Sequence, residues 1–284
     1  MSGYFQDKVV LVTGASQGIG REIALAFARE KGKLVLAART PDRLSAVAQE
    51  IHDLGSQALA VPTDISDETS VQALIDNAVD EFGRLDVLVN NAGIARVGGV
   101  QSEHFAADVL QTMQASLFGM IQVTRRVLPL FHKQGSGAIV NMSSVMGRKA
   151  FAQFGSYAIV MHGVSAFSDA LRQELAGSKI SVSVIHPGLT ATSLLSEAEP
   201  AKMPPPFRYM TPIAAEVVAQ AVVKAARAGT RRVVLPRTAN MLLLGEALSP
   251  WLGDLIAQAL AVKPIARLLG MSRGQTYHEV VLSR

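Results

Sequence analysis

The sequence of 284 residues contains no cysteine. This absence excludes disulfides, thiolate metal sites and cysteine nucleophiles, and it fits a reducing compartment, so we expect a cytoplasmic protein. The N-terminal residues lack an apolar run of the length a signal peptide needs, which predicts no targeting segment. Charged residues make up only 18% of the chain and apolar residues 49%, a balance that supports a large buried core and argues against disorder.

Acidic residues are scarce towards the end of the chain. After Pro200 there are eleven lysines and arginines but only four acidic residues, in a chain whose net charge is +4. A basic surface of this kind is compatible with nucleic acid, with an anionic membrane or simply with solvent. Aromatic residues make up only 5% and no nucleic-acid-binding module is recognisable, so we expect a solvated surface and no nucleic-acid partner.

Short apolar runs alternate with helical patterns along most of the chain. Continuous apolar runs of this length are typical of parallel strands that helices cover on both faces. The predicted strands are residues 8–13, 33–38, 57–61, 85–89, 138–142, 180–185 and 231–235, and the clearest helical patterns are residues 19–30, 43–54 and 71–82. The alternation predicts one α/β domain over residues 1–238, a single doubly wound (Rossmann-type) parallel sheet of about seven strands with helices on both faces.

Five prolines lie between residues 197 and 212. Proline removes a backbone donor and clashes with the preceding helical turn, so we expect no regular helix there. The stretch is too short for a domain linker and is a candidate lid.

A glycine-rich turn follows the first predicted strand directly and opens the first predicted helix. Residues without side chains let the backbone approach a pyrophosphate, and the helix N-terminus offers free N–H groups and a positive dipole end to that anion. Glycine triplets also occur in ordinary turns, but the strand before and the helix after favour a dinucleotide site. The residues predicted to form it are Gly14, Ser16, Gln17, Gly18, Ile19 and Gly20.

No acidic residue follows the second predicted strand, where one would bind the adenosine ribose of NAD. Arg39 stands there instead, and its guanidinium suits a 2′-phosphate. An ordinary surface arginine is the alternative, but with the glycine turn the pattern favours NADP(H) over NAD.

With these features the chain resembles the short-chain dehydrogenase/reductase family over roughly residues 8–235. The spacing Gly14-x-x-x-Gly18-x-Gly20 is that family's fingerprint. The resemblance implies that four further groups of residues bind the cofactor: Asp64 and Ile65 at the adenine, Asn90, Ala92 and Gly93 of an Asn-Asn-Ala-Gly motif, and Pro187, Gly188, Thr190 and Thr192 near the nicotinamide. It also implies a homodimer or homotetramer.

The family's catalytic signature is incomplete in this chain. The resemblance implies that Tyr157 exchanges a proton with the substrate oxygen, that it also contacts the cofactor, and that Ser144 binds the same oxygen. The family's lysine, four residues after the tyrosine, is replaced by Met161, and Ser116 stands at the asparagine position. A cation about 5 Å from a phenolate stabilises it by roughly 3 kcal/mol at an effective dielectric near 20. That stabilisation lowers the pKa of the phenol by about two units.

No neighbouring side chain is expected to replace that lysine. His162 is five residues from Tyr157 and therefore points away from the same helix face. Lys149 lies upstream in a loop, and only a large rearrangement would bring it near. Without a cation, Tyr157 is expected to titrate near the free pKa of tyrosine, about 10, as a weak proton donor and a weaker base.

Residues 239–284 form a predicted helical extension whose stripe of leucines is interrupted at Pro250. The stripe is expected to pack on the same domain or in a subunit interface, with peripheral membrane contact as an alternative. Val97, Met146 and Phe154 are expected around the substrate, and they favour a lipophilic carbonyl or alcohol.

Two interpretations therefore remain open. The first is an NADP(H)-dependent oxidoreductase that transfers hydride between the nicotinamide and a lipophilic carbonyl or secondary alcohol, with turnover impaired by the missing lysine. The second is a catalytically inactive NADP(H)-binding sensor or scaffold. Ser144 and Tyr157 favour the enzyme, whereas Met161 and Ser116 favour the binding protein.

Overall fold

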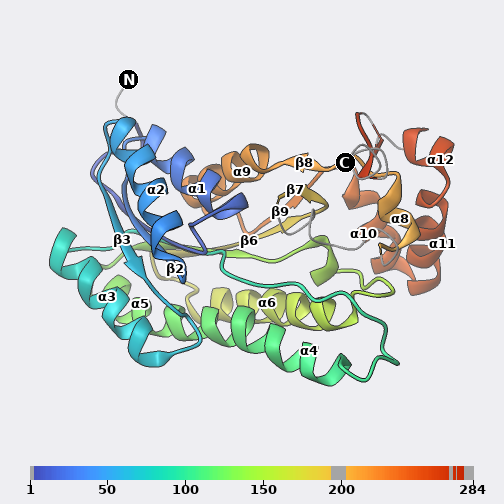
Figure 1. Cartoon of the computed structure of the whole chain (residues 1–284), viewed down its shortest axis with the longest axis horizontal. Helices are drawn as coiled ribbons and strands as arrows, with labels where there is room; N and C mark the ends of the chain where they lie inside the picture. The colour runs from blue at the N-terminus through green and yellow to red at the C-terminus, as the bar shows by residue number, and fades with distance from the viewer. Residues whose placement is uncertain (1–2, 193–202, 269–270, 273, 278–284) are drawn as a thin grey trace.

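The computed structural model describes residues 3–192, 203–268, 271–272 and 274–277 (Figure 1). Seven strands form one parallel sheet in the order β3-β2-β1-β4-β5-β6-β9. They are β1 (Val9–Thr13), β2 (Lys33–Ala38), β3 (Ala58–Pro62), β4 (Val87–Asn90), β5 (Gly137–Met142), β6 (Ile180–Pro187) and β9 (Arg232–Leu235). The predicted doubly wound sheet is confirmed. Each strand begins and ends within two residues of the positions predicted from the sequence.

Helices cover both faces of the sheet (Figure 1). On one face lie α1 (Gly18–Arg29), α2 (Pro41–Asp53) and α9 (Ala215–Ala228). On the other lie α3 (Glu68–Phe82), α5 (Gly119–Gln134) and α6 (Gly155–Glu174). Outside α6 packs α4 (Phe105–Thr112), which continues as a π-helix, η1 (Met113–Phe118), and a 3-10 turn, η2 (Val145–Gly147), follows β5. Because strand side chains are buried on both faces, the strands read as the unbroken apolar runs seen in the sequence.

The chain order of the strands creates a crevice for a ligand. From β1 the chain builds outward through β2 to β3 and then returns to add β4, β5 and β6 on the other side of β1. At such a reversal the loops after β1 and β4 separate, and ligands bind outside the carboxyl ends of the strands there. The glycine turn follows β1 and the Asn-Asn-Ala-Gly motif follows β4, so both predicted motifs lie at the reversal point.

The proline-rich stretch differs in part from its prediction. Residues 197–202 of the candidate lid lie outside the described residues, but a short helix, α8 (Pro205–Arg208), forms in the remainder. The expectation of no regular helix was therefore wrong for these four residues. Proline is tolerated in the first turn of a helix because the N–H it lacks would have no partner there. Beside α8, β7 (Thr190–Ala191) and β8 (Ile213–Ala214) form a small parallel sheet.

The C-terminal extension forms α10 (Ala239–Leu248), α11 (Pro250–Leu260) and α12 (Lys263–Leu268), at one end of the molecule (Figure 1). Leu242 and Ala257 share an apolar cluster with Met146, Phe154 and residues of α8. Within the described part of the chain, no helix is both long enough and apolar enough to cross a bilayer. The division into residues 1–238 and 239–284 stays a prediction.

Candidate active site

One cavity of about 980 Å³ lies at the carboxyl ends of the central strands. Every residue that the sequence assigned to the cofactor or to catalysis lines it, although these residues come from seven separate segments of the chain. They are Gly14, Ser16, Gln17, Gly18, Ile19, Gly20, Arg39, Asp64, Ile65, Asn90, Ala92, Gly93, Ser144, Tyr157, Pro187, Gly188, Thr190 and Thr192. The structure thus brings the predicted set together, while the role of each residue stays a prediction.

The glycine turn has a backbone that only glycine accommodates easily. Gly14 and Gly18 have φ angles of +66° and +56°, in the left-handed region that disfavours a Cβ. A Cβ at Gly20 would lie 2.1 Å from the carbonyl oxygen of Gly14, and one at Gly14 would lie 2.8 Å from the Cα of Ala92. The turn after β1 and the loop after β4 are therefore packed backbone to backbone.

The N-terminus of α1 fits an anionic ligand. Gln17 precedes α1 in an extended conformation, and its side chain makes no capping hydrogen bond to the first turn. There is also no acidic residue in that first turn to neutralise the helix dipole. Its amide groups and partial positive charge face the cavity, which is the arrangement that binds the phosphates of a dinucleotide.

Two arginines lie at the edge of the cavity beyond β2. Arg39 and Arg43 both line it, both are exposed, and Arg43 hydrogen-bonds to Gln17 of the glycine turn. Arg43 was missed in the sequence, although a second basic residue four positions after Arg39 was a usable signal. On the same side of the cavity, after β3, hydrogen bonds from Ser66 lower the pKa of Asp64, with a smaller contribution from the charge of Arg39, so Asp64 is ionised at neutral pH.

The two asparagines after β4 hold the loops of the cavity in place. Asn90 is buried and donates to Thr124 Oγ1 at 3.0 Å and to Asn141 Oδ1 at 2.9 Å, which ties β4 to α5 and β5. The Asn91 side chain donates to the carbonyl oxygens of Thr13 (3.0 Å) and Gly14 (3.2 Å). Asn91 was absent from the predicted site, yet it connects the glycine turn to the loop after β4.

Ser144 and Tyr157 meet at the inner end of the cavity. Ser144 follows β5, and its hydroxyl accepts from the Met146 amide at 3.1 Å and donates to the Pro187 carbonyl at 3.3 Å. Tyr157 lies in the first turn of α6 and lines the cavity with Ser144, close enough for the Ser144 hydroxyl to influence its pKa. Burial raises the pKa of Tyr157 above its ordinary value, and the Ser144 hydroxyl offsets only part of that rise. The phenol is therefore protonated at neutral pH.

Known proteins are similar to this chain in sequence. The model of the family described as short chain dehydrogenase matches residues 8–202. The chain belongs to this family of oxidoreductases. The ketoacyl reductase HetN of Nostoc sp. is 34% identical over 228 residues, which make up 80% of this chain and 78% of the relative. The 1,6-dihydroxycyclohexa-2,4-diene-1-carboxylate dehydrogenase of Acinetobacter baylyi is 38% identical over 200 residues, 70% of this chain and 73% of the relative.

Solved structures of short chain dehydrogenases have the same fold. Levodione reductase superposes with a TM-score of 0.74 at 28% identity, covering 81% of this chain and 96% of its own. The 3-ketoacyl-(acyl-carrier-protein) reductase of Brucella melitensis, complexed with NADH, superposes with a TM-score of 0.72 at 29% identity, covering 81% and 97%. A cavity for a nicotinamide cofactor is therefore a shared feature of the family fold.

Met161 lies one turn after Tyr157, at the position where the resemblance stated above leads us to expect a lysine. Met161 lines the cavity but is only 4% exposed, packed with Met120, Val160 and Val164. Among the described residues that line the cavity, the cations are Arg39, Arg43 and Arg96, and none is a lysine. His162 is exposed and Lys149 does not line the cavity, as expected from their sequence positions. Lys149 instead forms ion pairs with Glu246 (2.7 Å) and Asp254 (2.5 Å) of the extension.

Ser116 lies in the π-helix η1, where the helical ladder is locally widened. Its hydroxyl is buried and accepts from the Ile94 amide at 3.1 Å. A Cβ at Gly93 would lie only 3.0 Å from this hydroxyl. Single π-turns are frequent at functional sites of helical proteins. In this protein the π-turn supports the loop after β4 through a serine.

His186 supports Ser144 from behind and was not predicted from the sequence. It is fully buried in β6, and its Nδ1 lies 2.9 Å from the Ser144 carbonyl oxygen. Burial lowers the pKa of His186 to about 4, with nearby Arg232 and Arg148 acting in the same direction. The ring is neutral at pH 7, so its Nδ1–H donates to Ser144 and fixes the backbone there.

The end of the cavity beside Tyr157 is apolar. Val97, Met146 and Phe154 line it, as expected, together with Met203 and Phe207. Phe207 belongs to α8 and packs edge-on against Phe151, with ring centroids 4.7 Å apart. The proline-rich stretch thus supplies part of the apolar wall, which sequence periodicity did not reveal.

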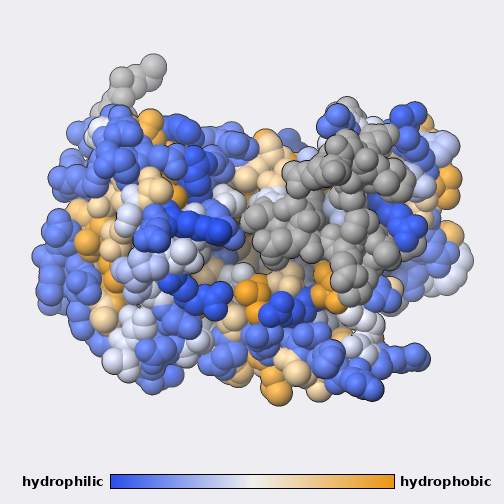
Figure 2. Space-filling model, in the orientation of Figure 1, coloured by the Kyte–Doolittle hydropathy of each residue, from blue (hydrophilic) through white to orange (hydrophobic). Residues whose placement is uncertain are grey.

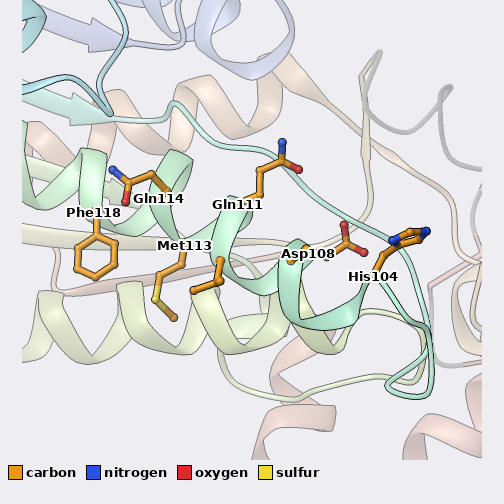
Figure 3. A pocket seen from close by; sticks show the side chains of 8 residues that line it. His104, Asp108, Gln111, Met113, Gln114 and Phe118 are labelled. Atoms are coloured by element: carbon orange, nitrogen blue, oxygen red, sulfur yellow. The ribbon is translucent and has the colours of Figure 1, made fainter.

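A second hollow lies along the outer side of α4 and η1 (Figure 3). Its volume is about 650 Å³, and His104, Asp108, Met113 and Phe118 are among the side chains that line it. None of the residues predicted for the cofactor or for catalysis lies there. The larger cavity is therefore the candidate active site.

Proposed function

We propose that the protein is an NADP(H)-dependent oxidoreductase that transfers hydride between the nicotinamide and a lipophilic carbonyl or secondary alcohol, with turnover slowed by the absence of the family's lysine. The observation that carries this proposal is the shared cavity, which combines the glycine turn, two arginines beyond β2 and the Ser144–Tyr157 hydroxyl pair. Assembly as a homodimer or homotetramer and a cytoplasmic location remain predictions.

The choice of NADP(H) rests on charge at the adenosine end of the cavity. Arg39 and Arg43 both line the part of the cavity expected to hold the adenosine ribose, and the residue directly after β2 is Arg39 rather than a carboxylate that would repel a 2′-phosphate. Arginine binds phosphate oxygens through paired, charge-assisted hydrogen bonds. We expect both arginines to contact the 2′-phosphate.

The residues near the nicotinamide end support reduction more than oxidation. The bound cofactor supplies or accepts the hydride. Tyr157 carries its proton at neutral pH, so it can donate to the oxygen of a carbonyl being reduced, and Ser144 orients that oxygen. Oxidation of an alcohol needs the deprotonated phenol, which burial disfavours and no cation stabilises. The apolar wall of Met146, Phe154 and Phe207 favours a lipophilic substrate.

A second function is supported by the packing of Met161. Because this thioether fills the position from which a cation would act on Tyr157, the protein is also consistent with an NADP(H)-binding sensor or scaffold that does not turn over. Both functions need the same cofactor site, and they differ only in the chemistry at Tyr157.

The cofactor site is tested by titrating the protein with NADPH and NADH and following cofactor fluorescence. Arg39→Ala should weaken NADPH binding by about tenfold to a hundredfold and leave NADH nearly unchanged, since a charge-assisted hydrogen bond contributes about 1.5–3 kcal/mol. Arg29→Ala is the matched control, because Arg29 is also exposed but lies in the last turn of α1, outside the cavity. Equal losses for the two cofactors would refute the NADP(H) preference. Failure of both to bind folded protein would refute the whole proposal.

A further inference from the structure

Exposed apolar side chains are concentrated on the C-terminal helices. Of fifteen large apolar residues exposed to solvent in the described chain, eight fall between residues 241 and 268. We call these eight the extension patch: Met241, Leu244, Leu248, Trp251, Leu255, Val262, Ile265 and Leu268. Orange and pale atoms appear among blue ones at the edge of the molecule formed by α11 and α12 (Figure 2). Clustered exposure of this kind marks an interaction surface more often than scattered single residues do.

Five residues of the extension patch lie on the outer side of a close-packed helix pair, α10 and α11. The inner sides of α10 and α11 meet at two glycines: a Cβ at Gly245 would lie 2.4 Å from Ile256, and one at Gly253 would lie 2.0 Å from Glu246. With the inner sides fixed in this way, the outer residues cannot turn inward. Leu248 and Trp251, each 71% exposed, stand on either side of the turn between the two helices. The most exposed residues of α10 and α11 are therefore the two that flank the turn of this helix hairpin.

The charge around the extension patch is positive. Glu246 and Asp254 are the acidic residues of the range 237–268, and both form ion pairs with Lys149. Arg237 before α10 and Arg267 in α12 are exposed. If a second copy docked on this surface across a twofold axis, these like charges would be brought together. A surface of anionic lipids offers the complementary charge, and a helix turn flanked by a tryptophan suits its interface.

We propose that the extension patch docks on the surface of an anionic lipid bilayer, with Leu248 and Trp251 inserted at the level of the headgroups. Burial of apolar side chains and attraction of basic residues to anionic lipid act together in such interfacial helices. The helix that carries Trp251, α11, also packs against α8, which contributes Phe207 to the cavity. Docking itself does not depend on the proposed cofactor or on turnover.

The chain carries its own probe, because Trp251 is its only tryptophan. Full-length protein is mixed with vesicles of phosphatidylcholine alone or of phosphatidylcholine and phosphatidylglycerol in equal parts. With the anionic vesicles, we expect the Trp251 emission to shift to shorter wavelength, acrylamide quenching to fall, and the protein to float with the vesicles. Added salt should weaken the effect. Leu248→Glu should reduce vesicle binding by about tenfold or more.

Val217→Glu is the matched control, because this substitution introduces the same charge at another exposed apolar residue. Val217 is 52% exposed and lies on α9, outside the extension. The variant should bind vesicles like the unmodified protein. The proposal is overturned if Trp251 emission and flotation do not respond to anionic vesicles, or if both glutamate variants lose binding equally. It is also overturned if the emission shifts with rising protein concentration in the absence of vesicles, since that result assigns the patch to a second copy of the chain.

Discussion

Replacing Met161 by lysine tests whether the residue one turn after Tyr157 limits proton transfer. Residues four apart on a helix have Cβ atoms about 5–6 Å from each other, so a lysine there places its charge within reach of the phenol. Both side chains line the active-site cavity. The substitution therefore adds a cation to a site whose tyrosine has a raised pKa.

The expected magnitude follows from Coulomb's law. At an effective dielectric near 20, a unit charge about 5–6 Å from a phenolate contributes roughly 3 kcal/mol, which lowers the pKa of Tyr157 by about two units. A better proton donor should raise kcat/KM for ketone reduction by about tenfold to a hundredfold at neutral pH. The lysine ammonium would be buried in an apolar cluster with Met120, Val160 and Val164. Because burial of a charge is unfavourable, the free energy of unfolding should fall by about 1–3 kcal/mol.

The assay compares NADPH oxidation by the parent and by Met161→Lys with a panel of aliphatic and aromatic ketones across pH. Met161→Leu and Met161→Gln are the controls: the first keeps the site apolar, and the second adds polarity of similar length without charge. An ultraviolet titration of tyrosinate, with Tyr157→Phe as the blank, gives the pKa of Tyr157 directly. Only the lysine variant should shift both the titration and the pH profile.

The reasoning is refuted if Met161→Lys binds NADPH and folds, yet Tyr157 titrates as in the parent and activity is unchanged. If the pKa falls but both proteins remain inert, the oxidoreductase proposal fails and the sensor or scaffold interpretation gains. If the parent is already fully active with one of the ketones, the missing lysine does not impair this enzyme. Each result selects one interpretation of the same cavity.

Two further predictions concern residues that support the site. Lys149→Met should lower the free energy of unfolding by about 1 kcal/mol in urea titrations. The substitution removes a nearly buried ammonium that pairs with Glu246 and with the exposed Asp254. An unchanged midpoint of urea unfolding would show that these ion pairs do not stabilise the fold. The pKa of His186 is about 4 in the folded protein and about 6.5 when unfolded, so the unfolded chain binds more protons between these values. The free energy of unfolding should therefore fall as the pH drops from about 7 to 4, by on the order of 3 kcal/mol in total for this residue. His186→Phe should flatten that part of the pH–stability profile. An unchanged profile in this variant would assign the pH dependence to another group.

The sheet and the cofactor side of the cavity were predictable because both depend on local sequence. Buried parallel strands are continuous apolar runs, and their ends are marked by glycine and asparagine motifs whose order follows from right-handed crossovers. Gly14 and Gly20 are required by backbone contacts within a few residues of the turn and across to Ala92. Such constraints leave a clear pattern in one sequence.

The remaining features depend on contacts between distant segments. His186 reads as one polar residue inside a strand, and only the fold shows that it binds the Ser144 carbonyl. Phe207 lies in a proline-rich stretch without periodicity, and its place in the cavity wall depends on packing against Phe151. The π-turn that carries Ser116 inserts one residue into a helical ladder, a change that helical periodicity does not indicate.

Cofactor binding and proton transfer are separable in this protein because different elements hold them. The turn between β1 and α1 and the end of β2 form the proposed phosphate-binding side through backbone conformation and arginines, and neither segment belongs to α6. The proposed proton-transfer side depends on the first two turns of α6, where the backbone at Met161 makes two hydrogen bonds: its carbonyl oxygen accepts from Ser143 at 3.0 Å and from Ser165 at 2.9 Å. We therefore expect a methionine at this position to weaken proton transfer at Tyr157 without disturbing the helix that carries it or the glycine turn. A chain with this division can keep its ligand at full affinity while its turnover declines, which is why binding and catalysis must be measured separately.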